Sequence, residues 1–327
     1  MTKGLSAGDR AVDFTRPDRE GAPQTLFERM VGAPFLLVVV NADHAESWSA
    51  ALDRCGQPSA LLIKGSPQAK GAGPLRLFDD GAVSTIYLGE RGGDAPTVFV
   101  IDGVFRVRAR IDGPLAEAME AARIALASID ALTPIAPGPI RRLAPCLLIP
   151  DVFDAGLCDA LIAAFYRSGG DASGMLRPDG AGGAALRVDP SAKMRRDARI
   201  ADSALDQRAE AAIAARVLPE ILRAVSFRVA GREAFKLVRY AAEEGGYFRP
   251  HRDNTTPDAA RRRFAMTINL NGGYEGGGLR FPEYGPEIYA PPKGGAIVFS
   301  CSLLHEATDV VRGARYALLT FFTGASR

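Results

Sequence analysis

The sequence predicts an α/β domain followed by an antiparallel jelly roll with flanking helices, and three observations lead to this prediction. Strand-like and helix-like segments alternate over residues 1–135, which is typical of an α/β layer. A proline-rich stretch over 136–145 follows, and neither a helix interior nor a central strand accommodates such a segment. Within 146–327, about eight short strand-like segments are separated by glycine and proline, which favours a double-sheet barrel.

The first domain is expected to be built around a central strand at 34–40. Its unbroken, β-branched apolar character is typical of a strand buried on both faces. The alanine-rich segment 115–129 has the amphipathic pattern of a closing helix. The other predicted elements are a helix at 45–54, a strand at 59–64, and a hairpin formed by 95–103 and 104–111.

The second domain is expected to open with helices and continue as short strands. Asp154 is a predicted N-cap for a helix with an apolar stripe, and 203–217 has the composition of a second helix. The strands are expected at 234–240, 247–253, 264–271, 278–281, 287–290, 295–300, 303–308 and 315–322.

Composition argues against several functional classes. Forty basic and 38 acidic residues leave a net charge of +2, which gives no reason to expect a nucleic-acid partner. We therefore interpret the basic runs at 195–196 and 261–263 as solvated surface. No apolar run approaches the ~20 residues that span a bilayer, and the first ten residues lack a secretory apolar stretch. The expectation is a cytoplasmic protein without a membrane partner.

The most informative stretch lies at His251 and Asp253. The chain has only three histidines. If 247–253 is a strand, His251 and Asp253 share a face, because side chains two apart point the same way. With His305 they would form a two-histidine, one-carboxylate set that leaves open positions on a ferrous ion. The alternatives are a surface ion pair of His251 with Asp253 and an ordinary half-buried His305.

Arg315 follows His305 by ten residues and begins a predicted strand. On one face of that strand Arg315 is followed by Ala317 and Leu319, so its neighbours there are small or apolar. If the guanidinium points inward, it needs an anion, because a buried unpaired charge costs several kcal/mol. A carboxylate could supply that anion through a bidentate contact. A bridge from Arg315 to a carboxylate of the core is the alternative.

Residues 146–323 resemble the Fe(II)- and 2-oxoglutarate-dependent dioxygenases, in their prolyl 4-hydroxylase-like branch. The resemblance implies a double-stranded β-helix in which His251, Asp253 and His305 bind Fe(II) and Arg315 binds 2-oxoglutarate. It also implies hydroxylation of a peptidyl proline or a small molecule, with release of succinate and CO2, and ascorbate as an accessory cofactor. Tyr240 and Thr267 compete as further contacts to the cosubstrate. The residues that carry the resemblance are Tyr240, Tyr247, His251, Arg252, Asp253, Leu270, Asn271, 276–282, 292–294, His305 and Arg315.

Residues 1–135 resemble the thioredoxin fold, with an opening similar to that of peroxiredoxin-type redoxins. The resemblance implies a cis peptide bond at Pro96. Redoxins place a thiolate after the first core strand, at the N-terminus of the next helix, where the helix dipole lowers its pKa. Here 41–48 contains no cysteine, and Cys55 lies about two helical turns too late. We expect a redox-silent scaffold that could serve a protein partner, with His44 as a structural or exposed residue.

Two rival functions remain at this point. A thiol peroxidase would depend on one of the four cysteines. A metal-binding protein without catalytic activity would bind iron and 2-oxoglutarate but would not decarboxylate the latter.

Overall fold

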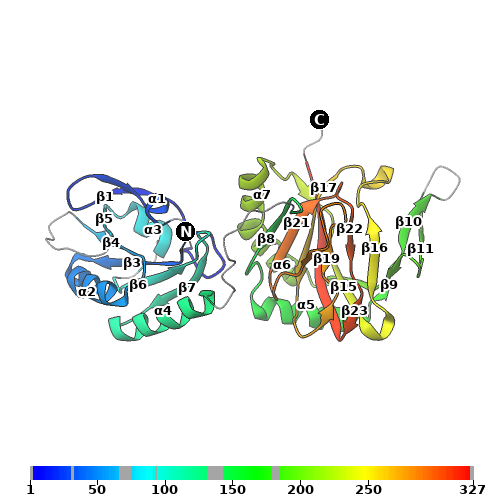
Figure 1. The fold of residues 1–327 in the computed structure, drawn as a ribbon, viewed down its shortest axis with the longest axis horizontal. Helices are drawn as coiled ribbons and strands as arrows, with labels where there is room; N and C mark the ends of the chain where they lie inside the picture. Colours follow the sequence, from blue (N-terminus) through cyan, green and yellow to red (C-terminus); the bar gives the residue numbers. More distant parts are fainter. Residues whose placement is uncertain are drawn as a thin grey trace. The chain divides into compact units, whose positions relative to one another are not determined.

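The computed structural model describes residues 3–30, 33–65, 75–90, 92, 94–130, 143–178 and 184–324. The chain divides into two compact units, Met1–Gly138 and Pro139–Arg327 (Figure 1). Most of the linker predicted at 136–145 lies outside the described residues. Within the described part, no helix is long and apolar enough to cross a membrane.

The N-terminal unit is built on one mixed sheet with the strand order β5-β4-β3-β6-β7. Its centre is β3 (Phe35–Asn41), which runs parallel to β4 (Ser59–Lys64). β4 in turn runs parallel to β5 (Leu75–Asp79). On the other side, β3 pairs antiparallel with β6 (Thr97–Ile101), which forms a hairpin with β7 (Val107–Asp112).

Helices cover both faces of this sheet (Figure 1). On one face, α2 (Ala45–Cys55) and α4 (Leu115–Asp130) pack against alternate residues of β3. On the other face, α1 (Leu26–Met30) and α3 (Ala82–Leu88) pack against the intervening residues. The predicted burial of the central strand on both faces is thus confirmed. The short elements of this unit are β1 (Thr15–Pro17), β2 (Pro23–Thr25) and η1 (Ala42–His44).

The predicted cis bond at Pro96 is wrong, since the described part of the chain has no cis peptide bond. The trans form is favoured for X-Pro bonds by ~0.5–1 kcal/mol. In the trans form, the Pro96 carbonyl accepts a long hydrogen bond from the Gly113 amide at 3.5 Å, just after β7.

The C-terminal unit contains two facing antiparallel sheets, the arrangement of a jelly roll. The larger has the order β8-β21-β17-β24-β15-β13-β9, with β14 also paired to β24, and the smaller has the order β12-β16-β22-β19-β20. The strands of the larger sheet are β8 (Cys146–Ile149), β9 (Asp171–Ala172), β13 (Arg196–Arg199), β14 (Gly231–Arg232), β15 (Lys236–Ala241), β17 (Arg262–Asn269), β21 (Ala296–Ser300) and β24 (Ala314–Thr323). Those of the smaller sheet are β12 (Lys193–Met194), β16 (Tyr247–His251), β19 (Leu279–Arg280), β20 (Ile288–Tyr289) and β22 (His305–Ala307).

The two faces of the larger sheet have different partners. Its outer face packs against α5 (Ala155–Ser168), α6 (Ser203–Arg216) and α7 (Leu218–Val225). The predicted N-cap of α5 is confirmed, because an Asp154 carboxylate oxygen accepts the Leu157 amide hydrogen at 2.7 Å. Its inner face meets the smaller sheet across a second apolar cluster. The remaining short elements are β10 (Met175–Pro178), β11 (Ala184–Arg187), β18 (Glu275–Gly276), β23 (Val310–Arg312), η2 (Ala242–Glu244) and η3 (Pro257–Ala259).

Candidate active site

The smaller sheet brings His251 and His305 together. His251 ends β16, His305 begins β22, and the two residues are direct partners across the antiparallel pair. The carboxylate of Asp253 lies between them, with its two oxygens 3.4 Å from the His251 Nε2 and 3.3 Å from the His305 Nε2. One ligand atom from each residue can be chosen so that all three lie within 4.8 Å of one another.

Hydrogen bonds fix which nitrogen of each ring faces the carboxylate. The His251 Nδ1 lies 2.8 Å from the Arg249 carbonyl oxygen, and the His305 Nδ1 lies 3.0 Å from the Leu303 carbonyl oxygen. A carbonyl only accepts, so each Nδ1 carries a proton, and in the tautomer that binds metals the Nε2 lone pair of each ring faces Asp253. Three acceptor groups therefore converge on one point, an arrangement that a cation would satisfy.

Burial keeps one of these rings neutral. It lowers the pKa of His305 to about 4, against the attraction of the Asp253 charge. Burial alone would raise the pKa of Asp253, but the interactions of its carboxylate with His251, His305 and Arg262 hold that pKa below its usual value. A neutral imidazole and an ionised carboxylate are the forms that bind metals.

Asp253 lies in the turn after β16, not on the strand as expected from the 247–253 prediction. Its position comes from backbone contacts instead. The Asp253 amide donates to the Cys301 carbonyl at 3.0 Å, and the Asp253 carbonyl accepts from Arg262 Nη1 at 3.1 Å. Arg262 is itself held by both carboxylate oxygens of Glu233, at 2.5 and 2.9 Å.

Arg315 is buried, with 3% of its surface exposed. Its guanidinium donates to Asn269 Oδ1 at 2.9 Å, to the Gly277 carbonyl at 2.8 Å and to Thr267 Oγ1 at 3.4 Å. All three partners are neutral, and no carboxylate of the described chain lies within salt-bridge distance. The alternative of a bridge to a core carboxylate therefore does not describe Arg315.

One cavity of about 690 Å³ joins the six residues predicted to bind iron or the cosubstrate. Tyr240 lines the cavity, and its ring centre lies 5.7 Å from the Arg315 guanidinium carbon. The Tyr240 hydroxyl accepts a hydrogen bond from Arg195 at 3.0 Å. Thr267 lines the cavity beside Arg315. The structure thus places both competing residues at the same cavity, alongside His251, Asp253, His305 and Arg315.

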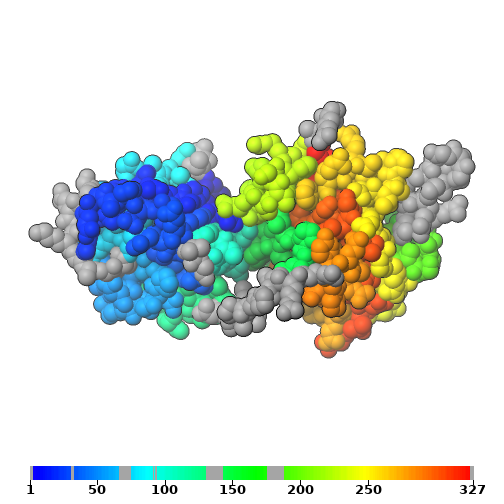
Figure 2. Space-filling model, turned by 45° about the horizontal axis from the view of Figure 1, so that its top comes forward, coloured from blue at the N-terminus to red at the C-terminus, as the bar shows by residue number. Residues whose placement is uncertain are grey.

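Arg252, between the two potential ligands in sequence, also lines the cavity but pairs with a carboxylate that does not. It forms an ion pair with Glu283 at 2.6 Å, and the side chains of both are partly exposed. In the space-filling view, the yellow surface around residue 250 lies beside the orange surface around residue 285 (Figure 2). This pair ties the segment that carries Asp253 to the segment before β20.

Residues 235–323 match the 2OG-Fe(II) oxygenase superfamily. The C-terminal unit contains a 2OG-Fe(II) oxygenase domain. Similar curated proteins include the multifunctional procollagen lysine hydroxylase and glycosyltransferase LH3 of Rattus norvegicus, 36% identical over 90 residues. Another is procollagen-lysine,2-oxoglutarate 5-dioxygenase 1 of Homo sapiens, 37% identical over 90 residues. Each match covers 26% of this chain and 11% of the relative, so the chain aligns with about a tenth of those proteins.

Solved structures with low overall similarity accompany these matches. A prolyl-4-hydroxylase of Pseudomonas putida is 22% identical, with a TM-score of 0.40. The alignment covers 56% of this chain and 94% of that structure. A prolyl hydroxylase of Trichoplax adhaerens, in complex with a hypoxia inducible factor peptide fragment, is 17% identical, with a TM-score of 0.43. The alignment covers 54% of this chain and 83% of that structure.

Besides Arg252, four cations that were not predicted as site residues also line the cavity, namely Lys193, Arg195, Lys236 and Arg262. The assignment of Arg195 and Arg262 to solvated surface is wrong, since the Arg262 side chain is only 17% exposed and pairs with Glu233. The Arg195 side chain is 8% exposed and forms an ion pair with Asp197 at 2.7 Å. For Lys236 a signal existed, because two-residue alternation places it on the same face of β15 as Tyr240.

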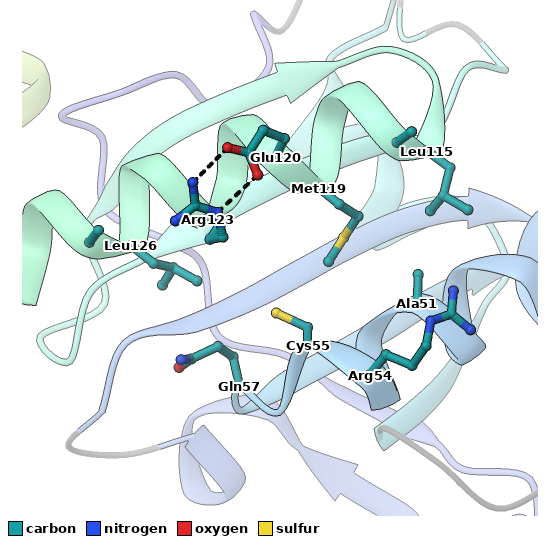
Figure 3. A pocket seen from close by; sticks show the side chains of 11 residues that line it. Ala51, Arg54, Cys55, Gln57, Leu115, Met119, Glu120, Arg123 and Leu126 are labelled. Carbon is teal, nitrogen blue, oxygen red and sulfur yellow. Dashed lines mark hydrogen bonds and ion pairs between the residues drawn. The ribbon is translucent and has the colours of Figure 1, made fainter.

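The N-terminal unit contains a second cavity, of about 660 Å³, between α2 and α4. Figure 3 shows Cys55 and Met119 approaching each other there from the two helices. Cys55 is the last residue of α2, which Gly56 caps in a left-handed conformation. A redoxin thiolate lies at the other, N-terminal end of the corresponding helix. His44, as expected, is exposed.

Proposed function

We propose that the C-terminal unit is an Fe(II)- and 2-oxoglutarate-dependent oxygenase that hydroxylates its substrate and releases succinate and CO2. His251, Asp253 and His305 would hold the iron, and Arg315 would hold the distal carboxylate of 2-oxoglutarate. The observation that carries the proposal is the presence, in one cavity, of three converging acceptor groups and a buried guanidinium whose partners are all neutral.

The donor set fits the metal. Two imidazole nitrogens and one carboxylate are the ligands typical of non-haem Fe(II) oxygenases, and they leave positions open for other ligands. When bound, the iron supplies the oxygen chemistry that couples oxidative decarboxylation of 2-oxoglutarate to hydroxylation. Backbone carbonyls at both Nδ1 atoms hold the imidazoles in the ligating tautomer.

The chain's own residues would orient the cosubstrate and exclude water. The Arg315 fork suits a carboxylate, and Thr267 and Tyr240 offer hydroxyl groups near it. Phe299 packs against His305 with ring centres 4.5 Å apart and lines the cavity. Phe248 stacks on His251 at 3.5 Å. These rings keep water from much of the region around the metal ligands.

The substrate is proposed to be either a peptidyl residue or a small molecule. Relatives named for hydroxylation of procollagen lysine and neighbours named as prolyl hydroxylases make a peptide one candidate, and the size of the cavity suits a small molecule. Ascorbate enters the proposal only as the accessory reductant that the family resemblance implies. A cytoplasmic location stays a prediction.

For the N-terminal unit we propose a thioredoxin-like, redox-silent module that serves a protein partner. Its five-stranded mixed sheet with helices on both faces supports the fold. The place of Cys55 at the wrong end of α2 supports the lack of thiol chemistry. Burial also raises the pKa of Cys146 and of Cys158 to about 11 each, and it raises the pKa of Cys301, which disfavours a thiol peroxidase at these three cysteines.

The test is succinate release by the purified protein with Fe(II), 2-oxoglutarate and oxygen. We expect turnover that a chelator abolishes and that added ascorbate sustains. Iron and 2-oxoglutarate binding without any succinate, with or without candidate substrates, would instead identify the catalytically inactive metal-binding protein.

A further inference from the structure

The cavity of the oxygenase domain holds more positive charge than iron and 2-oxoglutarate account for. Six cationic side chains line it, and Asp253 is the one acidic side chain among the described residues that do so. The six cations are Lys193, Arg195, Lys236, Arg252, Arg262 and Arg315.

Carboxylates outside the cavity lining neutralise three of these cations. Arg195 pairs with Asp197, Arg252 with Glu283 and Arg262 with Glu233. Arg315 is assigned to the cosubstrate by the proposed function. Lys193 and Lys236 remain, and neither lies within salt-bridge distance of a carboxylate in the described part of the chain.

Lys193 is the more buried of the two, with 5% of its surface exposed. Its Nζ donates to the Gly174 carbonyl at 2.5 Å. An ammonium has three N–H donors, so this bond leaves two that can serve a ligand. Burial lowers the pKa of Lys193 to about 7, with a further contribution from the charge of Arg195. A buried ammonium without a counter-ion is costly, and an anion in the cavity would offset that cost.

Two ring contacts connect Lys193 to the metal ligands. The Lys193 Nζ lies 5.0 Å from the centre of the Phe248 ring, and Phe248 stacks on His251. Residues 193 and 248 are also direct partners between β12 and β16. An anion held by Lys193 would therefore lie beside the iron, where a substrate must bind.

Lys236 extends the same positive region from the opposite sheet. It is on β15, two strand positions from Val238 and four from Tyr240 on the inward face. Burial lowers its pKa, and the Arg195 charge adds to that effect. Lys193 and Lys236 line the same cavity. Together they offer one anion two ammonium groups, one from each sheet.

We propose, on the basis of the proposed function, that the substrate presents a carboxylate or a phosphate to Lys193 and Lys236. The anionic group anchors the substrate between the two sheets, and the atom to be hydroxylated then lies toward His251. A neutral peptide backbone would leave both ammonium groups without a counter-ion.

The first experiment measures anion binding directly and needs no turnover. The thermal midpoint of the protein, loaded with Fe(II) and saturating 2-oxoglutarate without oxygen, is followed as inorganic sulfate is added, with sodium chloride at matched ionic strength as reference. We expect a saturable rise with sulfate beyond that with chloride. In the Lys193→Gln/Lys236→Gln protein, at least ten times more sulfate should be needed for the same rise.

Two controls separate charge from folding. Lys293, which pairs with Asp159 away from the cavity, provides a matched Lys293→Gln variant that should titrate like the parent protein. The Lys193→Arg/Lys236→Arg protein should keep the sulfate response. An unchanged sulfate titration in the double glutamine variant, or equal rises with sulfate and chloride, would overturn the proposal.

The second experiment identifies the source of the anion by stimulation of succinate release. One arm uses small carboxylic acids and phosphate monoesters, the other acidic peptides, each beside its uncharged amide or alcohol. The proposal predicts that charged members alone stimulate turnover, with a KM at least ten times higher in the Lys193→Gln protein and an unchanged KM for 2-oxoglutarate. Equal stimulation by uncharged members, or a raised KM for 2-oxoglutarate, refutes it. A parent protein that releases no succinate at all refutes the proposed function, while the sulfate titration still decides the anion site.

Discussion

Two arginines, one in each unit, are almost equally buried and differ in their partners. Arg76 on β5 is 5% exposed and donates to a carboxylate oxygen of Glu46 at 3.0 Å and to Ser49 at 2.7 Å. Arg315 on β24 is 3% exposed and has only neutral partners, beside a cavity of about 690 Å³. The first cation has its counter-ion within the fold, whereas the second needs one from a ligand. Burial alone therefore does not indicate a site, and the nature of the partners does.

The residues that follow β3 in the N-terminal unit and β16 in the C-terminal unit show a similar contrast. After β3, where a redoxin would place its thiolate, the N-terminal unit has an exposed His44 and no cysteine. After β16, the C-terminal unit has Asp253 between two oriented imidazoles. Of these two segments, only the one after β16 brings together groups that need a common cation.

The largest expected effect is that of His251→Ala. Removal of one ligand from the cluster should lower iron-dependent succinate release by at least about 100-fold. Even the loss of a residue that only orients a metal ligand lowers metal affinity or activity by about 10–100-fold. Exposed His44 supplies the matched control, and His44→Ala should retain full turnover. Comparable rates for the two variants would contradict the assigned metal ligands.

Next is the pair of buried arginines. Arg315→Gln should weaken 2-oxoglutarate binding by about 2 kcal/mol or more, or about 30-fold in KM, because the loss of one partner of a buried charge pair costs that much. Arg76→Gln should leave this KM unchanged and instead reduce the free energy of unfolding by about 1–2 kcal/mol. Kinetics and urea denaturation of both proteins measure the two effects. A KM that is equally raised by both changes would show that Arg315 acts through stability alone.

A smaller effect is expected at Arg262, which holds the Asp253 carbonyl. Arg262→Gln should lower the affinity for iron by about tenfold, as measured by anaerobic metal titration. The neighbouring Arg263 is exposed and donates to the Ala260 carbonyl, so Arg263→Gln is the control that should bind iron normally. The same affinity in both variants would exclude a role for Arg262 in positioning Asp253.

No effect is expected at Cys55. Because the thiol lies at the C-terminal end of α2, Cys55→Ser should change neither succinate release nor the small background of peroxide consumption. Loss of peroxide consumption in this variant would restore the thiol peroxidase hypothesis for the N-terminal unit.

The residues around the proposed metal could be predicted because their spacing carries the information. The order of His251, Asp253, His305 and Arg315 predicted that the chain returns to one end of the barrel, and the structure brings all four to one cavity. The choice between Tyr240 and Thr267 could not be made from spacing. Thr267 accepts a hydrogen bond from Arg315, whereas the Tyr240 hydroxyl accepts one from Arg195 and the Tyr240 ring also lies near Arg315.

Other features depend on contacts between distant residues, which periodicity does not reveal. β12 and β13 are short, polar strands, and their pairing with β16 and β15 buries Lys193 and Arg195. In the N-terminal unit, β5 and α3 were not predicted, because β5 interrupts its apolar residues with Arg76, whose carboxylate partner is 30 residues earlier. In both cases a charged residue was buried by a partner that the local sequence does not indicate.

The central claim is tested most directly by equilibrium binding without oxygen. Iron and 2-oxoglutarate bound per chain are counted for the parent protein, His251→Ala and Arg315→Gln. We predict one iron and one 2-oxoglutarate per parent chain, loss of iron in His251→Ala, and retention of iron with at least about 30-fold weaker 2-oxoglutarate binding in Arg315→Gln. A parent protein that binds no iron, or an Arg315→Gln protein that binds 2-oxoglutarate as tightly as the parent, would contradict the account.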